Sequence, residues 1–325
     1  MTDTRTPSRR TVLAAAGGLA ATPLLAGGAL AAAPGAGEAL TFLAVGDWGR
    51  DGAEHQRDVA ARMGEAAAAV GARFTASVGD NFYDDGVRSV DDPQWKTSFE
   101  DIYTAPSLQA PWFVALGNHD YRGEPQAQLD YARVSPRWKM PARYYKVAGA
   151  EVGAPFVDLF FIDTSPLVQS YRSKVETNIK RNVLAQDPAA QLAWLDAELA
   201  RSSAPWKLVF GHHTVFSGGS GHGDTAELKA QLKPILERRG VQAYVCGHDH
   251  DLQHIQRDGV DYICTGAGSE VRPVKAVQGT RFCLSRSGFS VYRLTPEALE
   301  VEFRDHLGAS VYKAAIPVRA GARAA

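Results

Sequence analysis

The sequence predicts a single mixed α/β domain, and three features support this fold class. Short apolar runs alternate with segments in which apolar residues recur at the helical period, as in a sheet built from strand and helix units. Towards the C-terminus the pattern changes to two-residue alternation around turn residues, which indicates antiparallel hairpins. The chain contains no repeat of roughly 20–50 residues and no internal linker, so one domain accounts for it.

The N-terminal half contains four apolar runs that predict strands. They span residues 41–45, 74–78, 111–116 and 156–162. A helix is predicted over 54–70, where apolar residues such as Val59 and Met63 fall on one helical face. These elements are the first strand and helix units of the predicted domain.

The second half of the chain adds two strands, two helices and the hairpins. Helices are predicted over 188–201 and 225–239, and strands over 207–210 and 243–246. The first helix begins with Asp187 as its cap and Pro188 as its first residue. The second follows a capping pattern formed by Asp224 and Glu227. Hairpin turns are predicted at Asp258-Gly259 and Pro296-Glu297.

The composition is that of an ordinary globular protein, with 325 residues, 45% hydrophobic and 22% charged. These values exclude an intrinsically disordered chain and a disulfide-dense mini-protein. The formal net charge is −1, without a long run of one sign, so no specific nucleic-acid binding is expected. Three cysteines leave at least one unpaired, and the sequence does not decide whether Cys264 and Cys283 form a bridge.

The N-terminal residues predict an export signal that is not part of the fold. Arg9 and Arg10 precede an Ala-, Gly- and Leu-rich run that ends in small-residue cleavage patterns, as in twin-arginine signals. The alternatives are a Sec signal or a membrane anchor, and Pro23 disfavours a permanent spanning helix. We expect a periplasmic or secreted protein without a membrane span in the mature chain. The expected segments are a signal at 1–33, a linker at 34–40, the folded domain at 41–317 and a frayed tail at 318–325.

Five predicted strands each end in glycine followed by a residue that can bind a metal. These strand ends are Gly46-Asp47, Gly79-Asp80, Gly117-Asn118, Gly211-His212 and Gly247-His248. Because sites in open α/β sheets form at the carboxyl ends of strands, we expect these side chains to converge. Carboxylate, amide and imidazole without thiolate favour hard or borderline metals such as Fe, Mn or Zn. Each motif alone is weak, but all five in this order predict a metal site.

The order GDWG, GDNFY, GNHDY, FGHH and GHDH resembles the metallophosphoesterases. The tyrosine in GDNFY is similar to that of purple acid phosphatases, and the likeness to the small, mammalian tartrate-resistant type runs from about Phe42 to Ile316. This resemblance implies a four-layer α/β/β/α sandwich, in which two mixed sheets are flanked by helices. It also implies an acid phosphatase with a dinuclear metal centre.

The resemblance implies two sets of metal ligands that share one carboxylate. A ferric ion would be held by Asp47, Asp80, Tyr83 and His250. A divalent ion, Fe, Zn or Mn, would be held by Asp80, Asn118, His212 and His248. The residue types agree with this division, because anionic oxygen ligands favour a trivalent hard ion and neutral ligands suit a softer divalent one.

The implied reaction is hydrolysis of phosphate monoesters by direct attack of metal-bound hydroxide, with two ions clamping the phosphate. By the same resemblance, His119 and His222 would contact the substrate, to stabilise phosphoryl oxygens or to protonate the leaving alcohol. Asp120, His213 and His254 are expected beside the ligands, although packing is the favoured role of His213, which would point away on an extended chain.

A basic segment at 167–186 stands where the mammalian enzymes have a loop tied by a disulfide, and it contains no cysteine. Its basic residues are Arg172, Lys174, Lys180 and Arg181. One hypothesis is a cationic lid that favours anionic substrates such as nucleotides or phosphoproteins. The other is an ordinary solvated loop.

Two other functions remain open from the sequence. One is a phosphodiesterase or nucleotide-hydrolysing metallophosphoesterase of the same fold, which Tyr83 disfavours because the wider superfamily commonly lacks this phenol. The other is a metal-binding protein without turnover, which the complete ligand set disfavours. A serine hydrolase and a P-loop NTPase are not supported, because neither motif occurs.

Overall fold

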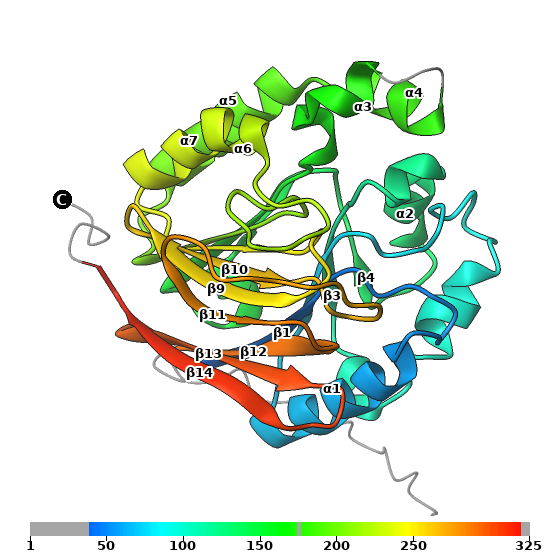
Figure 1. Ribbon diagram of the computed structural model, residues 1–325, viewed down its shortest axis with the longest axis horizontal. Helices are drawn as coiled ribbons and strands as arrows, with labels where there is room; N and C mark the ends of the chain where they lie inside the picture. Colours follow the sequence, from blue (N-terminus) through cyan, green and yellow to red (C-terminus); the bar gives the residue numbers. More distant parts are fainter. Residues whose placement is uncertain (1–38, 174–176, 320–325) are drawn as a thin grey trace, which may run out of the picture. The chain divides into compact units, whose positions relative to one another are not determined.

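Two seven-stranded mixed sheets pack face to face in the computed structural model, which describes residues 39–173 and 177–319 (Figure 1). The first sheet has the order β14 (Ser310–Pro317), β13 (Ala298–Asp305), β12 (Gly288–Leu294), β1 (Leu40–Val45), β2 (Thr75–Val78), β3 (Trp112–Ala115) and β4 (Trp138–Lys139). The second has the order β11 (Thr280–Leu284), β9 (Leu252–Arg257), β10 (Val260–Thr265), β8 (Ala243–Cys246), β7 (Trp206–Phe210), β6 (Val157–Phe161) and β5 (Tyr145–Ala148).

Helices cover the outer faces of both sheets, which gives the four layers that the resemblance implies. The helices are α1 (Gln56–Val70), α2 (Pro125–Tyr131), α3 (Gln169–Ser173), α4 (Asn178–Leu184), α5 (Pro188–Arg201), α6 (Ala226–Gln231) and α7 (Lys233–Arg238). Figure 1 shows α5, α6 and α7 beyond one sheet and α1 beyond the other. Among the described residues, no helix is both long and apolar enough to cross a membrane.

Alternation along the strands distributes apolar side chains into three core layers. On β1, Phe42 points into the layer between the sheets, while Leu43 packs in the layer beneath α1. Leu195 of α5 and Leu236 of α7 join the third layer, on the outer face of the second sheet. Because successive strand residues face opposite sides, a strand covered on both faces is apolar throughout, as the continuous runs predicted.

The parallel strands carry the predicted metal-capable residues to one edge. In the first sheet β1 pairs with β2 and β2 with β3, each in parallel. In the second sheet β6 pairs with β7 and β7 with β8, again in parallel. The carboxyl ends of parallel neighbours lie at the same edge of a sheet. Strands β1, β2 and β3 therefore end together in the first sheet, and β7 and β8 end together in the second.

Most predicted elements are confirmed, including helix 188–201 with Asp187 as its cap, whose carboxylate accepts a hydrogen bond from the Ala190 amide at 3.0 Å. The predicted hairpins are present as β9–β10 and β12–β13. The single helix predicted over 225–239 is wrong. It divides into α6 and α7, because Pro234 has no amide hydrogen to continue the first helix.

The cap predicted for that helix is also wrong. Thr225 is the N-cap residue and makes no side-chain capping bond. Asp224 instead accepts a hydrogen bond from the Ser217 amide at 2.9 Å and pairs with Lys229. Its carboxylate therefore ties the preceding loop to the helix and does not cap it.

The ends of the domain differ slightly from the expected boundaries. Leu40, assigned to the linker, is the first residue of β1 and is buried. Arg319, assigned to the frayed tail, forms an ion pair with Asp261. The predicted signal at 1–33 lies outside the described residues, as does the rest of the tail from 320 onward. All three thiols are free, so Cys264 and Cys283 do not form a bridge.

We predict that Phe42→Ala destabilises the domain by about 3–5 kcal/mol. The Phe42 ring is fully buried and stacks between Phe74, at 4.7 Å between centroids, and Tyr292, at 4.6 Å. Urea unfolding of the two proteins measures the difference. Val134→Ala serves as the control, because Val134 is 58% exposed and its loss should leave the unfolding free energy nearly unchanged. Equal stability of both variants would contradict the assignment of Phe42 to the core.

Candidate metal centre

The seven predicted metal ligands lie together at the carboxyl edge of both sheets. The first sheet contributes residues that follow β1, β2 and β3, and the second contributes residues that follow β7 and β8. They are Asp47, Asp80, Tyr83, Asn118, His212, His248 and His250, and none is more than 6% exposed. Segments far apart in the sequence thus bring buried carboxylates and imidazoles to one place. The buried carboxylates there need a positively charged partner.

The backbone is strained at three of these residues. Asp47, Asp80 and His248 adopt left-handed φ angles of 60°, 49° and 71°. Such angles are uncommon outside glycine and cost free energy, so they persist where the surrounding structure enforces them, often at functional sites. The strain turns each side chain inward directly after its strand ends.

Two glycines allow the carboxylates to approach the neighbouring loops. A Cβ atom at Gly117 would lie 2.2 Å from Asp80 Oδ1, and one at Gly247 would lie 2.2 Å from Asp47 Oδ2. Any larger residue would displace the carboxylate. These positions are therefore glycine for a steric reason, as the strand-end motifs indicate.

Tyr83 gathers the first group of donor atoms. Its hydroxyl oxygen lies 3.0 Å from Asp47 Oδ1, 3.0 Å from Asp80 Oδ2 and 3.1 Å from His250 Nε2. A phenol has one proton and can donate it to only one of these atoms. The remaining lone pairs face one another at close range, and a cation among the four atoms would satisfy all of them.

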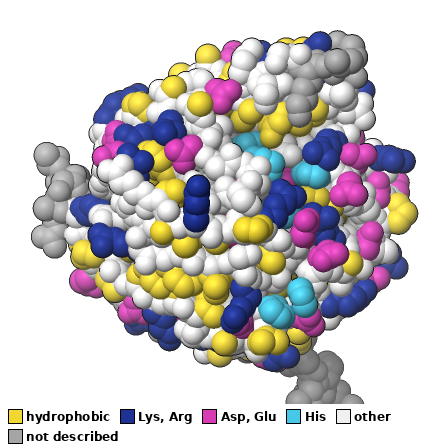
Figure 2. Space-filling model, in the orientation of Figure 1, with side chains coloured by type: hydrophobic (Ala, Val, Ile, Leu, Met, Phe, Trp, Pro, Cys, Tyr) yellow, Lys and Arg dark blue, Asp and Glu magenta, His cyan; other side chains and the backbone are white. Residues whose placement is uncertain are grey.

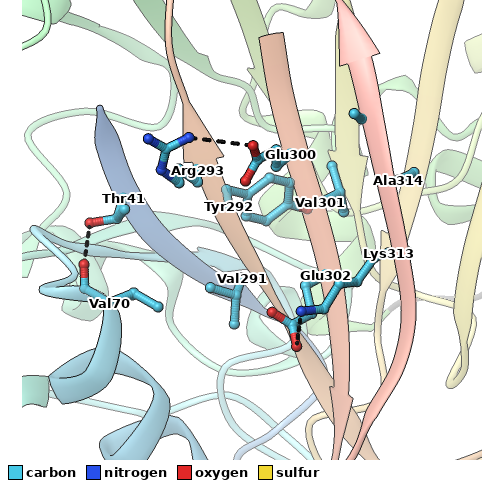
Figure 3. Close-up of a pocket in the computed structure, with 11 residues that line it drawn as sticks. Thr41, Val70, Val291, Tyr292, Arg293, Glu300, Val301, Glu302, Lys313 and Ala314 are labelled. Atoms are coloured by element: carbon cyan, nitrogen blue, oxygen red, sulfur yellow. Dashed lines mark hydrogen bonds and ion pairs between the residues drawn. The ribbon is translucent and has the colours of Figure 1, made fainter. Parts of the chain in front are cut away.

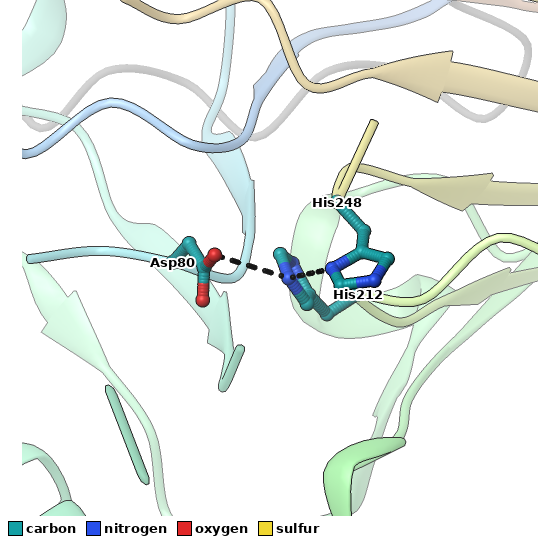
Figure 4. A group of neighbouring side chains, drawn as sticks. All are labelled: Asp80, His212 and His248. Atoms are coloured by element: carbon teal, nitrogen blue, oxygen red, sulfur yellow. Dashed lines mark hydrogen bonds and ion pairs between the residues drawn. The ribbon is translucent and has the colours of Figure 1, made fainter. Parts of the chain in front are cut away.

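His212 gathers the second group (Figure 4). Its Nδ1 lies 2.9 Å from the Val78 carbonyl, which only accepts, so this nitrogen bears a proton and Nε2 is the nitrogen that can bind a metal ion. Nε2 lies 3.3 Å from Asp80 Oδ2, 3.3 Å from Asn118 Oδ1 and 3.2 Å from His248 Nδ1. Donor atoms of Asp80, His212 and His248 all lie within 4.8 Å of one another, as a bound metal ion requires.

Asp80 Oδ2 belongs to both groups. The same oxygen lies near the Tyr83 hydroxyl and near His212 Nε2, so one carboxylate joins the two sets of donors. Its other oxygen accepts a hydrogen bond from the His119 amide at 2.7 Å. This geometry fits a carboxylate that bridges two neighbouring cations.

The carboxylates of Asp47 and Asp80 act on the titratable groups around them. Burial, assisted by the carboxylates of Asp47 and Asp80, raises the pKa of the Tyr83 phenol well above its usual range. Burial tends to lower the pKa of His212, but the same two carboxylates outweigh it and raise this pKa to about 10. Both shifts show that the protein attracts positive charge here, whether as protons or as metal ions.

The two predicted substrate-contacting histidines lie beside the donor groups. The His119 ring centroid is 4.3 Å from that of Tyr83, and its Nε2 lies 4.0 Å from Asp80 Oδ2. The His222 ring stacks on His248 with centroids 3.9 Å apart. Burial lowers the pKa of each histidine, although Asp80 opposes this at His119. Both imidazoles therefore border the donor groups in surroundings that disfavour their protonation.

Comparison with known proteins decides the family of the chain. Residues 40–252 match the calcineurin-like phosphoesterase family. The chain is 39% identical over 296 residues to purple acid phosphatase 4 of Arabidopsis thaliana, covering 86% of this chain and 84% of that protein. It is 36% identical over 311 residues to human tartrate-resistant acid phosphatase type 5, covering 89% and 94%. The chain belongs to the purple acid phosphatases.

A solved structure of the same fold is GAP50, described as the anchor in the inner membrane complex of Plasmodium. It superposes with a TM-score of 0.74 at 25% identity, covering 87% of this chain and 90% of that chain. The predicted fold class and family are thereby confirmed for this purple acid phosphatase. The roles of individual residues rest on the geometry described above.

The three residues expected beside the ligands have different positions in this purple acid phosphatase. Asp120 accepts hydrogen bonds from the amides of Gly117, at 2.8 Å, and Asn81, at 3.1 Å, so it braces two ligand loops. His213 packs against His248, with ring centroids 4.2 Å apart. His213 also contacts Thr164 and Tyr171 through its two ring nitrogens, at 2.8 and 3.0 Å.

His254 does not lie beside the ligands, contrary to expectation. Its Nδ1 is 2.9 Å from the Tyr312 hydroxyl and its Nε2 is 2.8 Å from Asp261 Oδ1. Both ring nitrogens are engaged in this separate buried cluster. The residue follows the GHDH motif closely in sequence, but β9 carries it away along the second sheet.

Four further residues surround the centre, and only one of them, Asp249 of GHDH, lies within a sequence motif. Asp249 accepts hydrogen bonds from the amides of His222 and Gly223, at 2.9 and 3.0 Å, and so holds the His222 loop. Arg50 lies over the Tyr83 ring, with its guanidinium carbon 3.9 Å from the centroid. Glu270 and Arg272 come from an irregular segment between β10 and β11. Of the other three, only Arg50 adjoins a motif, GDWG, that could have drawn attention to it.

The basic segment is helical where it is described. Within α4, Asn182 donates hydrogen bonds to the carbonyls of Tyr121 and Gly123, both at 3.0 Å, and so fixes this helix to the loop that follows β3. Arg181 lies 3.9 Å from Glu124. Lys174 is outside the described residues. The expected loop therefore contains two short helices, α3 and α4, beside the centre.

A cavity of about 490 Å³ lies elsewhere, on the outer face of the first sheet (Figure 3). Strands β12, β13 and β14 line it together with Thr41 and Val70. None of the predicted site residues lines this cavity. Its size therefore does not indicate the place of the chemistry.

Asp163 is a buried carboxylate next to the centre whose protonation affects stability. It is 1% exposed, accepts a hydrogen bond from the Tyr121 hydroxyl and leaves Oδ1 without a hydrogen-bond partner among the described residues. Burial raises its pKa to about 6, although Arg143 opposes this shift. Folding therefore favours the protonated acid.

We predict that Asp163→Asn gains stability relative to the native protein as the pH rises from 4 to 7. The native carboxyl must ionise in a buried site above its folded pKa, and this cost, on the order of 2 kcal/mol, is absent from the amide. Urea unfolding at several pH values measures the difference.

The control for this series is Asp196→Asn, because hydrogen bonds from Arg239 lower the pKa of Asp196. Its carboxylate stabilises the fold above the ordinary Asp pKa. This variant should therefore be less stable than the native protein throughout the range from pH 4 to 7, without the rise expected for Asp163→Asn. A difference between Asp163→Asn and the native protein that did not change with pH would refute the assignment.

Proposed function

We propose that this chain is an acid phosphatase that hydrolyses phosphate monoesters at a dinuclear metal centre. The observation that carries the proposal is Asp80 Oδ2, which lies in two groups of convergent donor atoms. Relatives named as purple and tartrate-resistant acid phosphatases at 36–39% identity support it. The buried arrangement of Asp80, His212 and His248 adds a metal-capable group to this support.

The donor atoms suit two different ions. Asp47, Asp80, Tyr83 and His250 would hold a ferric ion, since three of them supply anionic oxygen once the phenol ionises. Asp80, Asn118, His212 and His248 would hold a divalent ion, Fe, Zn or Mn. The raised pKa of the free Tyr83 phenol does not oppose this, because a trivalent cation beside the oxygen favours the phenolate.

Two such ions, when bound, would polarise a phosphate ester and lower the pKa of water so that hydroxide is available as the nucleophile. The side chains of the protein have separate tasks. His119 lies over the Tyr83 side of the centre and His222 over the His248 side, so the substrate phosphate would enter between them. One histidine would bind phosphoryl oxygens, and either could pass a proton to the leaving alcohol.

The alternatives are weaker for reasons specific to this chain. A phosphodiesterase of the same fold would not need the phenol of Tyr83, which here contacts three other donor atoms. A binding protein without turnover is the other alternative, since one structural neighbour is described as an anchor. The complete ligand set, with His119 and His222 beside it, favours catalysis over metal binding alone.

The substrates we infer are small phosphorylated molecules, with nucleotides and phosphoproteins as the candidates raised by the basic segment. Arg172 of α3 and Arg181 of α4 lie in this segment, and Arg181 is 3.9 Å from Glu124 in the loop after β3. Figure 2 shows histidine side chains at the surface with basic side chains near them. Arginine side chains of this segment beside the centre would attract anionic substrates.

We also propose export through the twin-arginine pathway to the periplasm or the medium. The proposal rests on Arg9, Arg10 and the apolar run up to Ala33. This pathway carries folded proteins, which suits an enzyme that acquires its metal ions before export.

We predict that Asp80→Asn loses metal and activity together. The substitution removes the one negative charge common to both donor groups, and asparagine tolerates the left-handed backbone better than most residues. Elemental analysis should find less than one metal ion per chain, and kcat/KM for p-nitrophenyl phosphate should fall at least about 10³-fold.

The control is Asp91→Ala, an exposed carboxylate outside the centre, which should retain metal and activity. Assays with bis-p-nitrophenyl phosphate rank diester against monoester hydrolysis in the same preparations. Full metal content and turnover in Asp80→Asn, or a preference for the diester, would sink the proposal.

The double variant Arg9→Lys, Arg10→Lys should remain in the cytoplasm with residues 1–33 uncleaved, because the translocase recognises the arginine pair itself. Fractionation of an expressing bacterium, followed by mass spectrometry of the N-terminus, measures this outcome. Arg5→Lys is the matched control within the same segment and should be exported normally. Normal export of the double variant would exclude the pathway.

A further inference from the structure

Arg272 lies at the mouth of the centre, on the segment between β10 and β11. Its backbone amide donates a hydrogen bond to the His250 carbonyl at 2.8 Å, which fixes the residue beside a proposed ligand. Its guanidinium Nη1 lies 3.2 Å from His222 Nε2. The side chain is 31% exposed, so it contacts His222 on one side and solvent on the other.

The guanidinium is close to the place where a substrate phosphate would bind. The His222 ring that it contacts stacks on His248 at 3.9 Å between centroids. His248 Nδ1 in turn lies 3.2 Å from His212 Nε2, in the donor group proposed for the divalent ion. Arg272 is therefore separated from this group by a single imidazole ring.

The charge of Arg272 is only partly compensated. Glu270 Oε2 lies 2.6 Å from Arg50 Nη2, whereas Glu270 Oε1 lies 3.8 Å from Arg272 Nε, beyond hydrogen-bond range. Arg50 is also committed to Ser269, at 3.3 Å, and to the face of the Tyr83 ring. One carboxylate thus serves two arginines and is bound mainly by the other one.

A guanidinium in this position can bind an anion in addition to its present partners. Arginine carries five N–H donors in a planar fork that matches phosphate oxygens in pairs. The contact of Arg272 with His222 uses Nη1 and leaves N–H groups of the fork that can turn toward solvent. An anion on the alcohol portion of a substrate would meet this fork just outside the donor groups.

We propose that Arg272 is a specificity-determining residue that binds a second phosphate group on the alcohol portion of the substrate. The inference rests on the proposed function and names the substrate class, monoesters of alcohols that carry another phosphate nearby. The competing hypothesis is a purely positioning role, in which Arg272 only holds the His222 ring in place. A positioning role would change kcat for every substrate by the same factor.

The test compares propyl phosphate with propane-1,3-diyl bisphosphate, which differ only in the second phosphate. In Arg272→Gln holoenzyme, the ratio of kcat/KM for the bisphosphate to that for propyl phosphate should fall about 10- to 100-fold, mainly through KM of the bisphosphate. Arg272→Lys should fall between the native enzyme and the glutamine variant, because it keeps the charge and loses the fork.

The matched control is Arg293→Gln, on the outer face of the first sheet, where Arg293 pairs with Glu300 at 3.3 Å. This variant should keep the native ratio. An unchanged ratio in Arg272→Gln, or an equal loss of kcat for both substrates, would overturn the inference while leaving the phosphatase intact. A native holoenzyme that cleaved neither compound would instead refute the proposed function, and this inference with it.

Discussion

The mutual repulsion of buried lone pairs is the constraint on which the centre depends. Asp47 and Asp80 place carboxylate oxygens 3.0 Å from one phenol oxygen, and His212 Nε2 lies 3.2–3.3 Å from atoms of Asp80, Asn118 and His248. Without positive charge this arrangement is unfavourable, because each group has lost its contact with water. Cations supply what the side chains cannot supply to each other, so metal binding and folding of this edge are coupled.

The fold holds this unfavourable arrangement through contacts behind the ligands. The Trp48 indole donates a hydrogen bond to Ser77 at 2.8 Å, and Ser77 donates one to Asn81 at 2.5 Å. Asn81 adjoins Asp80 and is also bound by Asp120, which reaches over from the loop after β3. Loops from neighbouring strands therefore brace one another beneath the ligands, and the left-handed backbone at Asp80 cannot relax independently.

The sequence predicted which residues converge at this edge but not what surrounds them, for a physical reason. Asp80 and His248 follow buried parallel strands, whose apolar pattern is visible and whose carboxyl ends must meet. His254 was misplaced because its nearness to the GHDH motif gave no information about where β9 leads. The break before α7 depends on Pro234, whose effect the helical period concealed. Glu270 has no pattern at all, since its segment has no regular structure and its partners come from elsewhere in the chain.

Chemistry and substrate selection therefore have different structural origins here. The ligands sit at strand ends, buried and held from behind, where any change of position would alter both donor groups. The rim of the centre, where Glu270 and Arg272 lie, is an irregular and partly exposed segment. Arg272 pairs only loosely with Glu270 there. Such a rim can vary without disturbing the ligands. Yet Arg272 Nη1 contacts the His222 ring, so a rim residue that selects the substrate also adjoins one of the two histidines beside the reacting phosphate. Comparing substrates can therefore separate the effect of Arg272 on selection from its effect on turnover. Its place in the structure cannot, because it contacts a histidine beside the centre.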